Sequence, residues 1–233
     1  MLISIIIPTL NEFQRLPRCI GQIRELGATE GPIEIIVVDG GSCDGTEKHS
    51  QLADKFLSAK RGKSSQCNAG ANAARGSILF FLHATVRVPS GALSAIRETI
   101  RNGFAGGGFN NRFSGIERQN LRLRKILTLG SPNSDNASNL RFYGDNGIFV
   151  SKEAFESLDG FKDIEIMEDY DFSKRMGERF SVKRIIEPRL VISPRRQIRN
   201  GILKTRLQWI TIHTLYKLGV SPRRLKRMYS DPR

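Results

Sequence analysis

The sequence of 233 residues has few cysteines, no long apolar run and no signal-peptide pattern. Its cysteines are few and odd in number (Cys19, Cys43 and Cys67), and none forms a Cys-x-x-Cys pair, so neither a disulfide framework nor a zinc site is indicated. The longest apolar run, residues 78–82, is far shorter than the roughly 20 residues that cross a bilayer. The first residues have neither a basic segment nor a small-residue cleavage site, so no signal peptide is predicted. We therefore expect a cytoplasmic protein.

Acidic residues are scarce at one end of the chain. Residues 194–233 contain eleven Lys or Arg and one acid, Asp231, a net charge of +10, whereas residues 1–193 carry only +4 of the total of +14. We expect a domain over residues 1–193 and a basic helical extension over residues 194–233 packed on it. A basic extension attracts polyanions without specifying which, so nucleic acid, anionic lipid and acidic substrates are all candidate partners.

Short β-branched runs alternate with helical patterns in the first half of the chain. The runs that predict strands are residues 2–7, 33–38 and 77–82. The segments that predict helices are residues 12–26, 45–56 and 63–75. This alternation favours an α/β fold with a doubly wound, mostly parallel sheet, in which ligands bind outside the carboxyl ends of the strands. We therefore expect the functional site just after Ile7, Val38 and Leu82.

The second half of the chain is less regular. Residues 103–108 are rich in glycine and do not follow a convincing strand. Residues 116–129 predict a basic helix, residues 132–139 a polar loop, and a further helix is expected to start near Glu168.

The basic extension predicts two helices. Residues 202–218 have apolar side chains around much of the helix circumference, which indicates packing on more than one side. Residues 221–227 predict a short basic helix suited to an anionic lipid surface. Peripheral contact with the inner face of a membrane is therefore one hypothesis, and a solvated basic face is the alternative.

Familiar nucleotide and hydrolase motifs are not matched. Gly62-Lys63-Ser64 resembles the end of a P-loop, but Leu57 stands where that motif needs a glycine. Asp44 stands where a nucleophile elbow needs its second glycine, and residues 103–108 do not fit the dinucleotide-binding pattern.

Polar residues follow the predicted strands instead. They are Thr9, Asn11 and Glu12 after the first strand, Asp39, Gly40 and Asp44 after the second, and later Arg61, Lys63, Gln66 and Asn68. A carboxylate at a strand end can accept a hydrogen bond from a ribose hydroxyl or a base N–H, and Arg61 or Lys63 can neutralise a diphosphate. Singly, Asn11 and Asp44 could merely cap helices. Together these residues predict a nucleotide cradle.

Four segments carry a resemblance to a known family. They read Ile-Pro-Thr-Leu-Asn-Glu, Val-Val-Asp-Gly-Gly-Ser-Cys-Asp-Gly-Thr, Arg-Gly-Lys-Ser-Ser-Gln-Cys-Asn-Ala-Gly and Ile-Met-Glu-Asp-Tyr-Asp. In combination they resemble glycosyltransferase family 2, and more closely a small bacterial subgroup that carries Phe-Leu-His-Ala-Asp-Thr and Tyr-Gly-Asp-Gln. The resemblance implies a GT-A fold, a nucleotide-diphosphate sugar donor and inversion at the anomeric carbon.

The resemblance also implies roles for individual residues. Thr9, Asn11, Glu12 and Asp39 would hold the base and ribose, and Arg61 would lie beside the nucleotide. We also expect Gly40, Gln66, Asn68 and His83 to bind the donor. Asp169, beside Glu168, would be the general base that takes the proton of the acceptor hydroxyl, and Asp145 would lie near the acceptor. The alternative for Glu168 and Asp169 is that they complement the dipole of a helix start, worth about 0.3–1 kcal/mol each.

One position departs from the subgroup. Thr85 stands where an aspartate is expected to hold Mg²⁺ or Mn²⁺ against the donor diphosphate, and a neutral hydroxyl is a much weaker ligand for such ions. Asp145 or Glu168 could supply a ligand, or Arg61, Lys63 or Arg87 could neutralise the diphosphate without metal. Otherwise the chain binds nucleotide and transfers poorly.

The sequence thus favours an inverting glycosyltransferase acting on a lipid-linked, glycan or small-molecule acceptor. A catalytically weak nucleotide-sugar binding protein is the first alternative, because of Thr85. A nucleic-acid-binding protein is the second, because of the net charge, although few aromatic residues and no recognisable binding motif argue against it. No nucleic-acid partner is therefore expected.

Overall fold

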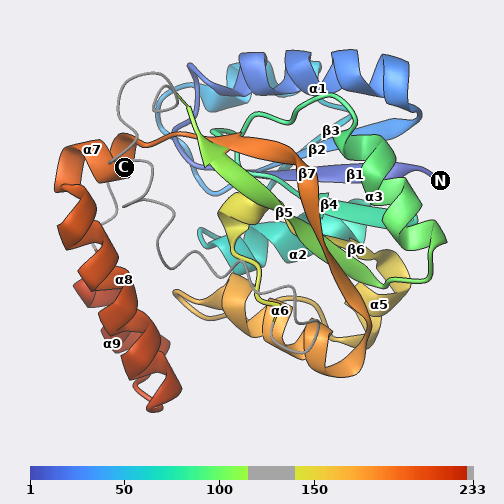
Figure 1. Cartoon of the computed structure of the whole chain (residues 1–233). Helices are drawn as coiled ribbons and strands as arrows, with labels where there is room; N and C mark the ends of the chain where they lie inside the picture. Colours follow the sequence, from blue (N-terminus) through green and yellow to red (C-terminus); the bar gives the residue numbers. More distant parts are fainter. Residues whose placement is uncertain (115–139, 230–233) are drawn as a thin grey trace.

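The computed structural model describes residues 1–114 and 140–229 around one seven-stranded sheet (Figure 1). The strands are β1 (Ile3–Thr9), β2 (Ile33–Asp39), β3 (Lys55–Ser58), β4 (Ile78–Phe81), β5 (Gly106–Phe113), β6 (Phe149–Ser151) and β7 (Val182–Ile192). Their order is β3-β2-β1-β4-β6-β5-β7. Strands β1 to β4 pair in parallel, β5 pairs in parallel with β7, and β6 is antiparallel to both of its neighbours. The expected doubly wound, mostly parallel sheet is confirmed.

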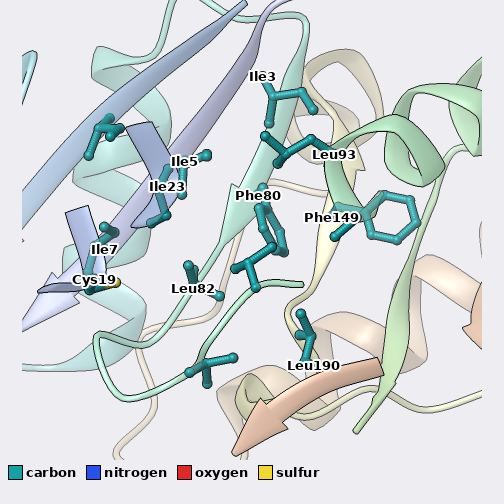
Figure 2. Close-up of a cluster of buried hydrophobic side chains, with 14 of the residues drawn as sticks. Ile3, Ile5, Ile7, Cys19, Ile23, Phe80, Leu82, Leu93, Phe149 and Leu190 are labelled. Atoms are coloured by element: carbon teal, nitrogen blue, oxygen red, sulfur yellow. The ribbon is translucent and has the colours of Figure 1, made fainter. Parts of the chain in front are cut away.

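Helices cover both faces of the sheet. On one face lie α1 (Leu16–Glu30) and α3 (Ala92–Arg101); on the other lie α2 (Lys63–Ala73), α5 (Lys152–Ser157) and α6 (Glu168–Arg179) (Figure 1). Because side chains alternate along a strand, Ile5 and Ile7 of β1 pack with the α1 side and Ile6 with the α2 side. Figure 2 shows Ile5 in the same buried cluster as Ile23 of α1. This burial on both faces is the reason why β1 is apolar almost throughout.

Several sequence expectations about elements were wrong. The helix expected at residues 45–56 is a 3₁₀ helix, η1 (Thr46–Leu52), followed by the edge strand β3. The helix expected from residue 12 begins at Leu16, with Pro17 in its first turn. Residues 106–108 begin β5: side chains there would collide with Phe142 and neighbouring strands, so the usual β-branched signal is missing. The expectations for residues 116–129 and 132–139 lie outside the described residues.

Three helices end the described chain: α7 (Arg195–Asn200), α8 (Ile202–Lys217) and α9 (Pro222–Met228). The helices expected at residues 202–218 and 221–227 are therefore confirmed, as is the start of α6 at Glu168. Helices α8 and α9 lie beside one another (Figure 1), and Ile212 and Leu225 join the α6 residue Tyr170 in a third apolar cluster.

The expectation that α8 packs on more than one side was wrong within the described part of the chain. Leu203, Leu207 and Ile210 are exposed, whereas Ile212 is fully buried. Of the helices in residues 1–114 and 140–229, none has both the length and the apolar character of a membrane-spanning helix.

Candidate active site

The carboxyl ends of β1 and β2 are held together by a buried amide. Nε2 of Gln66, on α2, donates hydrogen bonds of 2.8 Å to the carbonyl oxygens of both Thr9 and Val38. Gly40 lies directly against the same amide. The structure thus brings together three residues expected to bind the sugar donor: Thr9, Gly40 and Gln66. The Gln66 amide holds the two strand ends in place.

The carboxylate of Asp39 braces the turn that follows β2. It accepts hydrogen bonds from the N–H groups of Gly41 (2.9 Å) and Ser42 (2.8 Å), and from the hydroxyl groups of Thr9 (3.3 Å) and Ser42. Asn11, which adopts a positive φ of 56°, accepts a 3.0 Å hydrogen bond from the N–H of Cys43. The loops after β1 and β2 are therefore tied to each other, and Thr9, Asn11 and Asp39 meet as expected.

Asp44 and Arg15, the ion-pair partner of Glu12, line a depression beside these loops. The buried Glu12 carboxylate pairs with Arg15 at 2.9 Å. The backbone N–H of Glu12 donates to the hydroxyl of Thr46 at 3.0 Å. Asp44 accepts from the N–H of Phe13 at 2.9 Å. The depression is lined by Asn11, Phe13, Gln14, Arg15 and Asp44.

Two other expected donor-binding residues, Arg61 and Asn68, lie just before α2 and on α2. The amide of Asn68 is engaged with Phe161: it donates to the carbonyl oxygen at 2.7 Å and accepts from the N–H at 2.9 Å. This pair fixes the loop that leads into α6. The Arg61 side chain is exposed, just before α2.

A second depression gathers the acidic candidates. It lies where β1 and β4 end and α6 begins, and its lining includes Pro8, Lys63, Cys67, His83, Gly144, Glu168 and Asp169. The two depressions share the end of β1, since Pro8 lines one and Asn11 the other. Asp39 is not among the described residues that line either one. The structure therefore joins His83, Glu168 and Asp169 directly, and connects them to the donor loops through β1.

The carboxylate of Asp169 is fixed by two backbone groups. Its Oδ2 atom accepts a 2.7 Å hydrogen bond from the N–H of Gly144, and its Oδ1 atom accepts from the N–H of Tyr170 at 2.7 Å. Asp169 lies in the first turn of α6, where the helix dipole favours a negative charge. Carboxylate oxygens have further lone pairs, so Asp169 can still accept a proton or a hydrogen bond from a bound molecule.

The neighbouring Glu168 and Lys63 form a partly buried charge pair. Burial raises the pKa of Glu168, and the adjacent Asp169 raises it further, against the opposing effect of Lys63. The Lys63 Nζ atom lies 4.0 Å from Glu168 Oε1. Burial favours neutral Lys63, but the charges of Glu168, Asp169 and the exposed Asp145 raise its pKa overall. A cationic lysine thus lies beside two acidic side chains in the depression where β1 and β4 end.

The described side chains of the site do not form the ligand set of the expected divalent metal ion. Within residues 1–114 and 140–229, no three His, Cys, Asp or Glu side chains are grouped so as to hold a metal ion. Thr85 is half-buried and is not one of the described lining residues of either depression. Glu168 faces Lys63, which competes with a cation for its charge.

One ring from the C-terminal helices, that of His213, packs near Asp169. The ring of His213, on α8, contacts Tyr143 and Tyr170 edge-to-face, with centroids 5.3 and 5.2 Å away. Burial lowers the pKa of His213, and the charge of Asp169 opposes that shift. No motif in the sequence points to His213, because this residue lies in an apolar helical segment far from the family motifs.

Solved structures share this architecture. S. aureus TarS matches with a TM-score of 0.64 at 14% identity, over 83% of this chain and 37% of that chain. TarS 1–349 in complex with UDP-GlcNAc matches with 0.63 at 15% identity, over 83% of this chain and 58% of that one. The mannosyltransferase PcManGT from Pyrobaculum calidifontis, in complex with GDP-Man and Mn²⁺, matches with 0.62 at 20% identity, over 97% and 67%. The likeness and the sheet order define a GT-A-like fold.

The sequence itself gives the family. Residues 4–158 match the profile of glycosyl transferase family 2, and the chain belongs to that family. A search of curated protein sequences found no match. The chain spans about a third of the length of TarS, so the similarity concerns one part of that protein.

Proposed function

We propose that this chain transfers a sugar from a nucleotide-diphosphate donor to an acceptor hydroxyl with inversion, and that Asp169 is the general base. Family membership supports the reaction class. The observation that carries the role of Asp169 is its fixed carboxylate, held by the N–H of Gly144 in a depression that the end of β1 connects to the donor loops. Two structures of similar fold were solved with UDP-GlcNAc and with GDP-Man, which supports a nucleotide-sugar donor.

The chemistry follows from this placement. The nucleotide would lie on the loops after β1 and β2, with the sugar directed towards Asp169. The acceptor oxygen attacks the anomeric carbon, Asp169 takes the hydroxyl proton, and the nucleoside diphosphate leaves from the opposite face with the bonding electron pair. A single carboxylate is enough for this displacement, because no covalent intermediate with the protein is needed.

Lys63 would supply positive charge close to the reacting centre. Its ammonium group lies 4.0 Å from Glu168 Oε1 in the depression that Asp169 also lines, and its raised pKa keeps it protonated at neutral pH. A cation that is fixed before reaction stabilises charge developing on a leaving diphosphate without reorganisation. PcManGT was solved with Mn²⁺, but the described side chains of this chain do not form a matching ligand set, so we assign no step to a metal.

The variant Asp169→Asn tests the base directly. It keeps the size of the side chain and removes the proton acceptor, so transfer should fall by about 10²- to 10⁴-fold while donor affinity changes little. Asp163→Asn is the matched control, because Asp163 pairs on the surface with Lys60. Near-native transfer by Asp169→Asn would contradict the assignment.

A weak nucleotide-sugar binding protein is the second candidate, favoured by Thr85. A thermal-shift screen with UDP-, GDP- and dTDP-sugars, with and without Mg²⁺ or Mn²⁺, identifies the donor, because a ligand that binds only the folded chain raises its stability. Binding with turnover in the presence of candidate acceptors supports the transferase. Binding of the same sugar without hydrolysis or transfer supports the second candidate.

A further inference from the structure

Helix α8 has apolar residues on two opposite faces. On the inner face Ile212 is fully buried in the third apolar cluster, beside Trp209 and Tyr216. The outer face exposes Leu203, Leu207, Ile210 and Leu218 by 70%, 56%, 54% and 74%. Successive residues of an α-helix turn by about 100°, so these four side chains fall within about 80° of one another. With the exposed Thr214, which falls between Ile210 and Leu218 on the same face, they form one strip, here called the outer stripe.

Basic residues border the outer stripe on both sides. By the same geometry Lys204 lies along one edge, and Arg206 and Lys217 along the other. Residues 202–217 contain no acid. Long cationic side chains beside an apolar strip can rest on hydrocarbon with their charges at the level of lipid headgroups. On the neighbouring α9, Arg223 and Arg227 are exposed and add to the positive charge.

We propose that the outer stripe docks on an anionic lipid bilayer, with α8 lying flat in the membrane interface. The charge pattern selects this occupant. A second copy of the chain would bring the same basic borders against one another, whereas anionic headgroups neutralise them. An exposed apolar strip with basic edges and no acids is the pattern of helices that bind the bilayer surface without crossing it.

Docking in this way would orient the candidate active site. His213, on the other side of α8, contacts Tyr143 and Tyr170, next to Asp169. A single helix, α8, would therefore lie between the membrane surface and the candidate active site. The docking surface itself does not depend on the proposed sugar transfer, and the two can fail separately.

Sedimentation of the full-length chain with vesicles tests the proposal. One set of vesicles contains phosphatidylcholine and phosphatidylglycerol, the other phosphatidylcholine alone. The chain should bind the anionic vesicles. The double variant Leu207→Gln/Ile210→Gln should bind them about tenfold less, because it removes apolar surface from the stripe. The matched control is Leu52→Gln/Ile186→Gln, at two exposed apolar residues outside the C-terminal helices, and it should bind like the unmodified chain.

Three results would overturn the proposal. The unmodified chain could fail to bind anionic vesicles. The stripe variant could bind as well as the unmodified chain, which would assign the attraction to basic residues alone. Light scattering could show that the unmodified chain is a dimer that the stripe variant converts to a monomer, which would assign the stripe to a second copy. Circular dichroism and nucleotide-sugar binding confirm in each case that the variants remain folded.

Discussion

The N–H of Gly144 donates a 2.7 Å hydrogen bond to Oδ2 of Asp169, joining the turn before β6 to the first turn of α6. The turn comes from the 3₁₀ helix η3 (Gly144–Asn146), whose Asn146 donates to the carbonyl oxygen of Phe109 on β5 at 3.0 Å. The orientation of the candidate base is therefore set by the sheet and not by α6 alone.

Substitution of Gly144 by alanine should disturb this hydrogen bond. A methyl group there would collide with Nε2 of His83, so the backbone or the imidazole must move. Because small misplacements of catalytic groups are costly, we expect transfer to fall by about tenfold or more, measured as initial rate at saturating donor. Gly21→Ala on α1 is the control, since its methyl group meets nothing within 4 Å. Equal rates for both variants would show that the contact is unimportant.

The variant Lys63→Met should weaken donor binding. It removes the cation beside the buried Glu168 carboxylate, which raises the pKa of Glu168 further. We expect about a tenfold loss of affinity for a nucleoside diphosphate by calorimetry, in line with the loss of one charge-assisted contact. Lys60→Met is the control, because Lys60 pairs with the exposed Asp163. Unchanged affinity in Lys63→Met would remove Lys63 from the site.

The variant Thr85→Asp should create a dependence on metal. An aspartate at this position, after His83 of the depression, adds the anionic oxygen that Mg²⁺ and Mn²⁺ favour. We expect turnover of the variant to rise with Mn²⁺ and to fall on addition of EDTA. Thr85→Asn supplies a neutral side chain of the same size and should show no such response. If Thr85→Asp behaves like Thr85→Asn, the missing carboxylate is not what limits metal binding.

The buried Glu34 should contribute stability that depends on pH. Burial would raise its pKa, but hydrogen bonds from the Arg75 N–H, the Ser4 hydroxyl and the Arg75 guanidinium, with the charge of Lys55, lower it to about 2. This contribution is therefore complete above the ordinary pKa of 4.5 and is lost as the pH falls towards 2.

Glu34→Gln should lower the free energy of unfolding by about 2 kcal/mol at pH 7, a value that allows for solvent screening of the exposed Arg75. The difference from the unmodified chain should shrink as urea unfolding is repeated between pH 6 and pH 3. Glu47→Gln, at an exposed position, should show no such trend. A difference that is constant with pH would contradict the account of Glu34.

The sequence was sufficient to predict three of the seven strands, all of them buried on both faces. Strands β1, β2 and β4 read as apolar runs because both of their faces meet helices. Strand β3 was missed because it is a short edge strand, β6 because it has three residues, and β7 because its apolar run is broken by charged residues and Pro188. In these strands neighbouring elements, more than local pattern, decide the conformation.

The candidate site divides in the same way. Asp39 ends β2 and Asn11 follows β1, so their meeting could be predicted from the rule that parallel strands end at one edge. The structural engagement of Gln66 and Asn68 could not, because it depends on which backbone carbonyl lies within reach of each amide. His213 could not be found either, since only the docking of α8 against Tyr170 brings it near Asp169.

The Gln66 amide has a consequence for ligand capture. By bonding the carbonyl oxygens of Thr9 and Val38 at once, it ties α2 and the ends of β1 and β2 into a single rim. A rim that is already ordered loses little freedom on association, so more of the contact energy becomes affinity. We therefore expect the proposed nucleotide donor to bind at this rim with little rearrangement of the protein.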